Sequence, residues 1–106
     1  MTPPVDKPPI SADADGRVLL QGPLTFATVG ARLKASAGLF RSHKQLCFDL
    51  QAVTSVDSAA LALVVEWLRL GERHAVAVRF EHVPDALRSL AEVSELEQIE
   101  SALAAS

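Results

Sequence analysis

Two adjacent polar residues, Asp57 and Ser58, have the types and the position to act in binding or chemistry. They follow the buried-looking apolar run Leu46 to Leu50 and a short polar segment, and they precede the strongest helical pattern of the chain. Asp and Ser oxygens accept hydrogen bonds from the free N–H groups of a first helical turn, and a carboxylate suits the positive end of the helix dipole. The pair therefore predicts a helix that begins at Asp57 or Ser58, and a capping role alone accounts for it.

The other residues that could carry chemistry do not form a recognisable catalytic or metal-binding motif. His43, His74 and His82 lie in predicted loops or at strand ends, without metal-ligand spacing, and are expected to be solvated. Cys47 is the only cysteine and lies in an apolar run, which predicts a buried structural thiol. The five glycines form no phosphate-binding loop, and there is no nucleophile elbow. The sequence therefore predicts no catalytic residues, no metal site and no cofactor.

Length and composition narrow the class of protein. The chain has 106 residues, 49% of them hydrophobic, which suits one domain with a real core. Its net charge of −3 and its 5% aromatic content argue against nucleic-acid binding. No apolar stretch approaches the roughly 20 residues that span a membrane, and proline-rich residues 1–9 do not form a secretory signal. We expect a disordered tail over 1–9, a single domain over 10–106, a cytoplasmic location and no membrane insertion.

Hydrophobic periodicity predicts alternating strands and helices. Strands are expected at Arg17 to Leu24, Leu46 to Leu50 and Ala75 to Phe80. The spacing of Phe26, Val29 and Leu33 predicts a first helix that stops near Gly38, and a second is expected over Ser58 to Leu70, ended by Gly71. A third helix should follow Pro84, and its inner face would hold Val83, Leu87, Leu90 and Ala91. A short last helix would place Leu96, Ile99 and Leu103 inward. This alternation predicts an α/β fold with a mixed, mostly parallel sheet of about four strands flanked by helices.

The helix after Asp57 has two different faces. A wide apolar arc includes Ala60, Leu63, Val64, Leu68 and Trp67, and this position favours a core role for the tryptophan. On the opposite stripe, the small residues Ser58 and Ala62 would let another protein approach closely, above a polar rim of Glu66 and Arg69. An ordinary solvated face, with Glu and Arg supporting the helix, explains the stripe equally well.

Several segments together resemble the STAS domain family. The family pattern is an apolar strand ending in Asp-Leu, a spacer, and then Asp-Ser-Ser-Gly-Leu opening a helix. In this chain the corresponding segments are Cys47-Phe48-Asp49-Leu50 and Val56-Asp57-Ser58-Ala59-Ala60-Leu61. The upstream Leu20-Gln21-Gly22-Pro23-Leu24 is similar to the family's first strand. The resemblance covers about residues 16 to 100, and it implies a STAS-like fold and a binding module, not an enzyme.

Two branches of this family imply different partners. Anti-sigma factor antagonists are switched by phosphorylation of the second serine of the motif, where this chain has Ala59, which lacks a hydroxyl. The STAS subunit of the Mla phospholipid-transport ABC system carries Asp, a hydroxyl residue, two small residues and Leu-Ala-Leu, as Asp57 to Leu63 do here. In that branch the module binds the cytoplasmic ATPase, and the hydroxyl residue lies in the contact, a role that falls on Ser58.

The resemblance therefore implies a non-catalytic accessory subunit that binds and regulates the ATPase of a phospholipid-transport ABC complex maintaining outer-membrane lipid asymmetry. Such a subunit would associate with the inner-membrane complex through its partner. The expected contact residues are Thr54, Ser55, Asp57, Ser58, Ala59, Ala62, Val65, Glu66 and Arg69. No phosphorylation is expected. The alternative is an anti-sigma factor antagonist that binds an anti-sigma factor kinase and is phosphorylated at Ser58.

Overall fold

A computed structural model describes residues 10–94 and 102–103 of the chain. In chain order the elements are β1 (Arg17–Leu24), α1 (Val29–Ser36), α2 (Leu39–Ser42), β2 (Gln45–Val56), α3 (Ser58–His74), β3 (Ala77–Glu81) and α4 (Asp85–Ser94). The tail expected over 1–9, and Leu96 and Ile99 of the expected last helix, lie outside the described residues. Leu103, the third inward position of that helix, is buried.

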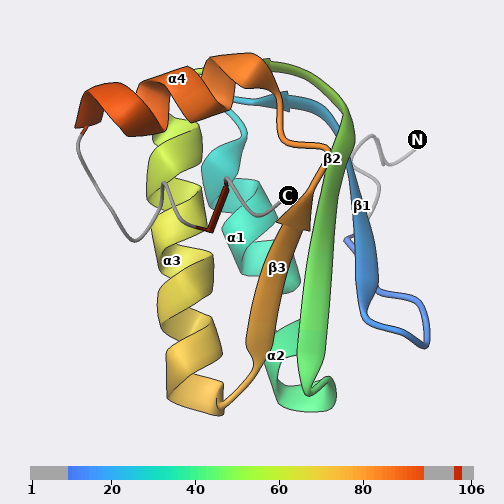
Figure 1. Cartoon of the computed structure of the whole chain (residues 1–106). Coiled ribbons are helices and arrows are strands. Elements are labelled where there is room, and N and C mark those ends of the chain that lie inside the picture. Colours follow the sequence, from blue (N-terminus) through green and yellow to red (C-terminus); the bar gives the residue numbers. More distant parts are fainter. Residues whose placement is uncertain (1–9, 95–101, 104–106) are drawn as a thin grey trace, which may run out of the picture.

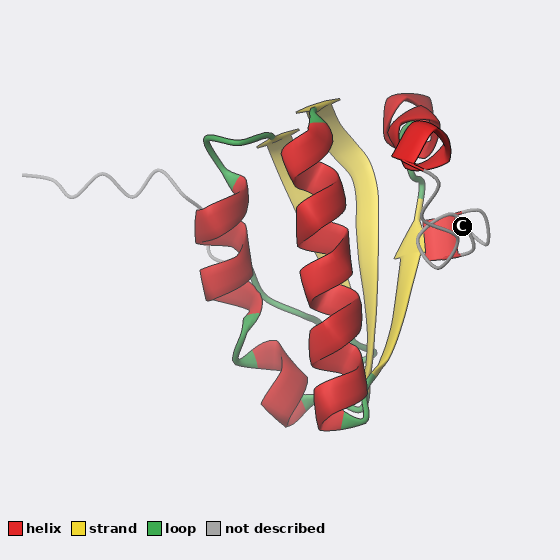
Figure 2. Cartoon of the chain, turned by 90° about the vertical axis from the view of Figure 1, so that its left-hand side faces the viewer, coloured by secondary structure: helices red, strands yellow, loops and turns green. Residues whose placement is uncertain are grey.

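The three described strands form one parallel sheet in the order β1-β2-β3, so β2 is the central strand, as predicted. Helices α1, α2 and α3 lie on one side of the sheet, and α4 lies beyond the β3 edge, where it contacts α3 (Figures 1 and 2). The α/β class is confirmed. Among the described residues, the sheet has three strands where about four were expected, and both strand pairs are parallel. None of the described helices has the length and apolar character needed to cross a membrane.

The central strand extends well beyond its apolar run. Residues 51–56, expected to form a polar loop, continue β2 and pair with β1 as far as Leu24 and Val56. Gln51, Thr54 and Ser55 are exposed within this extension. The expectation of a loop was wrong because backbone pairing with β1 holds these polar residues in an extended conformation, although they contribute little to the core.

The helix α3 is longer than its sequence pattern predicts. It was expected to stop at Gly71 but continues to His74, and it ends at Ala75, which has a left-handed backbone with φ 56°. Gly71 is buried, and a Cβ there would lie 2.8 Å from the Val76 carbonyl oxygen and 2.7 Å from Cγ2 of Val78. The glycine therefore lets α3 approach the start of β3 and does not end the helix.

An aromatic cluster fills the space between α3 and the sheet. The rings of Trp67 and Phe48 are stacked with their centroids 3.9 Å apart, and Phe80 packs against both. The indole N–H of Trp67 donates a 2.7 Å hydrogen bond to Oγ of the buried Ser36. The core role predicted for Trp67 is confirmed, and its polar atom is satisfied inside the core.

The region around the first helix differs most from expectation. The helix α1 begins only at Val29, and Phe26, expected on its inner face, lies in the preceding turn with 86% of its surface exposed. Gly38 does stand beyond this helix, but it leads at once into the short α2, which the sequence pattern did not reveal. The α2 residue Phe40 is buried.

Candidate functional site

Asp57 joins two loops at the carboxyl end of the sheet. As the N-cap of α3, it accepts a 2.8 Å hydrogen bond from the Ala59 N–H through Oδ1. Its second oxygen, Oδ2, accepts a 3.0 Å bond from the N–H of Phe26 in the turn between β1 and α1. Since β1 and β2 are parallel and end together, these two loops are neighbours. The predicted cap is confirmed, and its second bond could not be anticipated from local sequence.

Ser58 is exposed at the first position of α3, directly beside this cap. The positions that follow it on the predicted stripe are also accessible: Ala62 and Arg69 are exposed, and Val65 and Glu66 are partly exposed. Arg69 and Glu66 form an exposed ion pair at 3.5 Å. The side chains of this stripe are therefore reachable by another molecule, and they project from a helix held firmly at its start.

The remaining residues expected to contact a partner lie close to Asp57 along the chain. Thr54 and Ser55 are exposed near the end of β2, and Ala59 is partly exposed in the first turn of α3. All nine predicted contact residues thus belong to one continuous segment formed by the end of β2 and one side of α3. Phe26 reaches the same place from another part of the chain, and no local pattern in the sequence predicts this.

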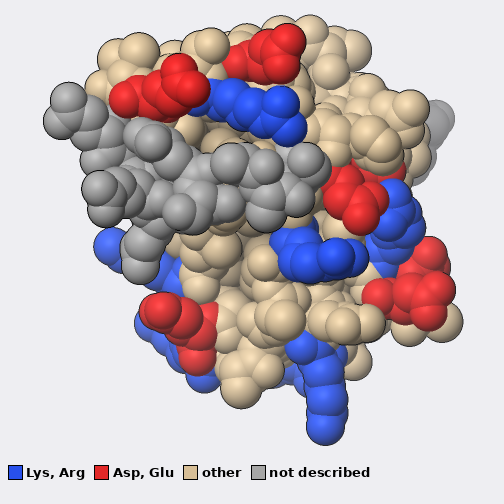
Figure 3. Space-filling model, viewed as in Figure 1, with Lys and Arg blue, Asp and Glu red and all other residues tan. Residues whose placement is uncertain are grey.

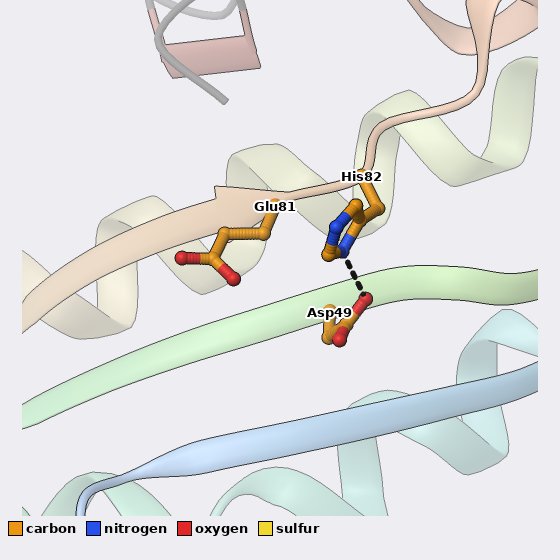
Figure 4. A group of neighbouring side chains, drawn as sticks. All are labelled: Asp49, Glu81 and His82. Carbon is orange, nitrogen blue, oxygen red and sulfur yellow. Dashed lines mark hydrogen bonds and ion pairs between the residues drawn. The ribbon is translucent and has the colours of Figure 1, made fainter.

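A second polar cluster lies across the strands on the side of the sheet away from α3. Asp49 of β2 is hydrogen-bonded to Nδ1 of His82 at 2.9 Å, and Glu81 of β3 lies beside them (Figure 4). Arg17 of β1 is paired with both carboxylates, at 3.2 Å to Asp49 and 2.5 Å to Glu81. This cluster ties together all three strands and the connection that leads to α4.

The carboxyl groups of the cluster are held in their charged forms. Burial raises the pKa of Asp49, but the Gln51 N–H, His82 and Arg17 outweigh it, and the net pKa is lowered. The hydrogen bond and charge of Arg17 lower the pKa of Glu81. Basic and acidic side chains accordingly lie side by side toward the right-hand edge of Figure 3. His82, expected to be a solvated loop residue, does follow β3 and has a side chain that is 52% exposed, but it is also bonded to Asp49 and has a left-handed backbone with φ 56°.

One atom each from Asp49, Glu81 and His82 lies within 4.8 Å of the others, so these residues have the types and spacing of a divalent-cation site. Both carboxylates are, however, already paired with cations: Arg17 contacts both, and Arg79 lies 3.8 Å from Glu81. The arrangement is thus a complete charge-paired network. The nearby Cys47 is buried, as predicted, and burial raises the pKa of its thiol, which keeps it protonated and unreactive.

Comparison with solved structures relates this fold to known proteins. The anti-sigma factor antagonist SpoIIAA in its unphosphorylated form superposes with a TM-score of 0.58, at 16% identity, over 78% of this chain and 79% of that one. A structure described as Mglu matches with a TM-score of 0.57 and 26% identity over 71% of this chain. The structure described as Mglu in its native form matches with a TM-score of 0.51 and 22% identity over 69% of this chain. The chain corresponds to only 19% and 23% of the length of those two Mglu chains.

Comparison of the sequence with families of proteins identifies the domain itself. No curated protein matches the chain significantly. The family model described as "Mlab, STAS domain" matches residues 10–103, almost the whole described structure. STAS domains are generally binding and regulatory modules that interact with partner proteins. The chain therefore belongs to the family of Mlab-type STAS domains.

Proposed function

We propose that this chain is a non-catalytic accessory subunit that binds and regulates the ATPase of a phospholipid-transport ABC complex maintaining outer-membrane lipid asymmetry. It acts in the cytoplasm and is held at the inner membrane through this partner. Membership in the Mlab-type STAS family supports the accessory role. The observation that carries the choice of site is the exposure of Ser58 on the first turn of α3, beside the Asp57 cap.

The geometry of this surface keeps the entropy lost on binding small. Ser58 and Ala62 are short side chains, so little rotamer freedom is lost when a partner covers them. The start of α3 is already fixed by the two hydrogen bonds of Asp57, so the surface needs no ordering on association. The Ser58 hydroxyl can donate or accept a hydrogen bond at the contact. The ion pair of Glu66 and Arg69 would lie at the rim.

The experiment is a co-purification of the chain with the ATPase of a phospholipid-transport ABC complex. Ser58→Arg should abolish co-purification, because a long cationic side chain prevents close approach. The fold should survive, because the position is exposed and a cation near a helix N-terminus costs only about 0.3–1 kcal/mol. Ser89→Arg, an identical change at an exposed position of α4, is the matched control and should leave binding intact. Unchanged binding by Ser58→Arg would refute the site.

A second candidate function is a phosphorylation-controlled antagonist of an anti-sigma factor. The structural similarity to SpoIIAA over most of both chains favours it. In this chain the phosphate acceptor would be Ser58, since Ala59 has no hydroxyl. Mass spectrometry after incubation with anti-sigma factor kinases separates the two functions. One added phosphate at Ser58 would favour the antagonist, and no added phosphate would favour the transport subunit.

A further inference from the structure

Phe26 is the most exposed of the large hydrophobic side chains in the part of the chain that the structure describes. It is 86% exposed, compared with 81% for Val93 and 52% for Leu19. A single exposed apolar side chain is ordinary in a folded protein. Phe26 differs from the other two because its backbone is bonded to the cap residue Asp57, one position before Ser58.

The turn that carries Phe26 is rigid. Thr28 closes it twice: its Oγ1 accepts from the Thr25 N–H at 2.9 Å and donates to the Pro23 carbonyl at 2.8 Å. The Thr28 and Val29 N–H groups also donate to the Thr25 carbonyl, at 2.8 and 2.9 Å. With the bond from Phe26 to Asp57, the backbone is held from both sides. A large aromatic side chain is thus presented to solvent on a fixed backbone, which reduces the entropy lost on binding.

The surroundings of Phe26 carry almost no charge, although 22% of the chain is charged. No Asp, Glu, Lys or Arg occurs from Val18 to Ala31, or from Leu50 to Val65 apart from Asp57. The guanidinium of Arg32, which follows, is tied to the Gln21 carbonyl of β1. The small residues Ala27, Gly30 and Ala31 are exposed next to Phe26 in sequence. Helices α1 and α3 lie side by side and start at the same end of the sheet (Figure 2). This uncharged surface is therefore continuous with the start of α3.

We propose that Phe26 is the aromatic anchor of the partner interface and inserts into an apolar pocket of the same protein that contacts Ser58. This inference rests on the proposed function and adds a contact residue and the chemistry of the partner's surface. Depletion of charge around a buried aromatic residue is the usual composition of a protein–protein interface centre. An anionic membrane would instead require a cluster of Lys and Arg around the aromatic residue, whereas the segments from Val18 to Ala31 and from Leu50 to Val65 contain none, and Arg32 is bound to the Gln21 carbonyl. Asp57 is the positioning residue, because its carboxylate holds the backbone of Phe26 in place.

The test is calorimetric titration of the full chain into the purified ATPase. Phe26→Ala should weaken the affinity by at least about thirtyfold, the loss typical of an interface hot spot. Phe26→Leu, which keeps part of the apolar volume, should lose less. Val93→Ala removes another highly exposed apolar side chain, from α4, and should change nothing. None of these positions is buried, so the unfolding transition should stay where it is.

A second measurement reads the environment of the side chain directly. Phe26→Trp places an indole in the turn, and its fluorescence should shift to shorter wavelength on addition of the ATPase, because the indole leaves water. The buried Trp67 provides a constant background. A shift on addition of phosphatidylglycerol vesicles instead would contradict the proposal.

The possible failures are distinguishable. If Ser58→Arg loses binding and Phe26→Ala binds like the unmodified chain, the anchor is wrong and the proposed function stands. If the unmodified chain does not bind the ATPase at all, both are overturned.

Discussion

Asp49 and Asp57 belong to the same stretch of chain, one within β2 and the other at the start of α3, and both accept hydrogen bonds from backbone and from distant residues. Around Asp49 the neighbouring side chains Arg17 and His82 are paired within the domain. Around Asp57 the carboxylate is equally occupied, but it holds two accessible residues, Ser58 and Phe26, in place. Satisfied polar groups stabilise this fold, and the side chains beside Asp57 remain accessible for the partner contact proposed above.

The largest effect on stability should come from Asp49→Ala. Removing this carboxylate leaves the Gln51 N–H and His82 without this acceptor and Arg17 with Glu81 alone, and hydrogen bonds to charged groups contribute about 1.5–3 kcal/mol. We expect a loss of that size in the free energy of unfolding, measured by urea denaturation, with partner affinity unchanged. Asp85→Ala removes an almost fully exposed carboxylate and should cost less than about 0.5 kcal/mol. If the folded Asp49→Ala variant binds the partner more weakly, the cluster around Asp49 does not serve stability alone, and the contrast with Asp57 is wrong.

Asp57→Ala should have a smaller effect on stability and a clear effect on binding. Loss of an N-cap costs about 1 kcal/mol, and loss of the bond to Phe26 frees the turn that carries it. Urea denaturation and partner titration on the same samples measure both effects. Asp57→Asn, which keeps an oxygen for the cap, should retain most of the stability. If partner affinity is unaffected when Asp57 is replaced by Ala, the positioning role is wrong.

The smallest effect concerns pH. The pKa of Asp49 in the folded domain lies below the ordinary value of 3.8, so its contribution to stability is present above that value and is lost as the pH falls through the lower, folded-state pKa. The stability difference between the unmodified chain and Asp49→Asn should therefore be constant near neutral pH and shrink below about pH 4. Urea midpoints at a series of pH values measure it. A difference that grows on acidification would contradict the lowered pKa.

Much of the fold follows from local sequence. The bounds of β1, the central place of Leu46 to Leu50, the start of α3 and the buried position of Trp67 are all predicted by short-range periodicity and capping preferences. The errors occur where a distant element overrides the local pattern. Residues 51–56 form a strand because β1 lies beside them, and Gly71 stays helical because its lack of a side chain lets α3 meet β3.

The sequence alone determined that Asp57 caps a helix and that Ser58 stands at its start, because capping depends on residues two or three positions apart. Only the tertiary structure decided that Phe26 lies beside them and that Arg17, Asp49 and His82 form one network. These contacts join residues 31 to 33 positions apart, and no local signal marks them. The physical reason is that parallel strands require crossover connections, so neighbours at a sheet end are always distant in the chain.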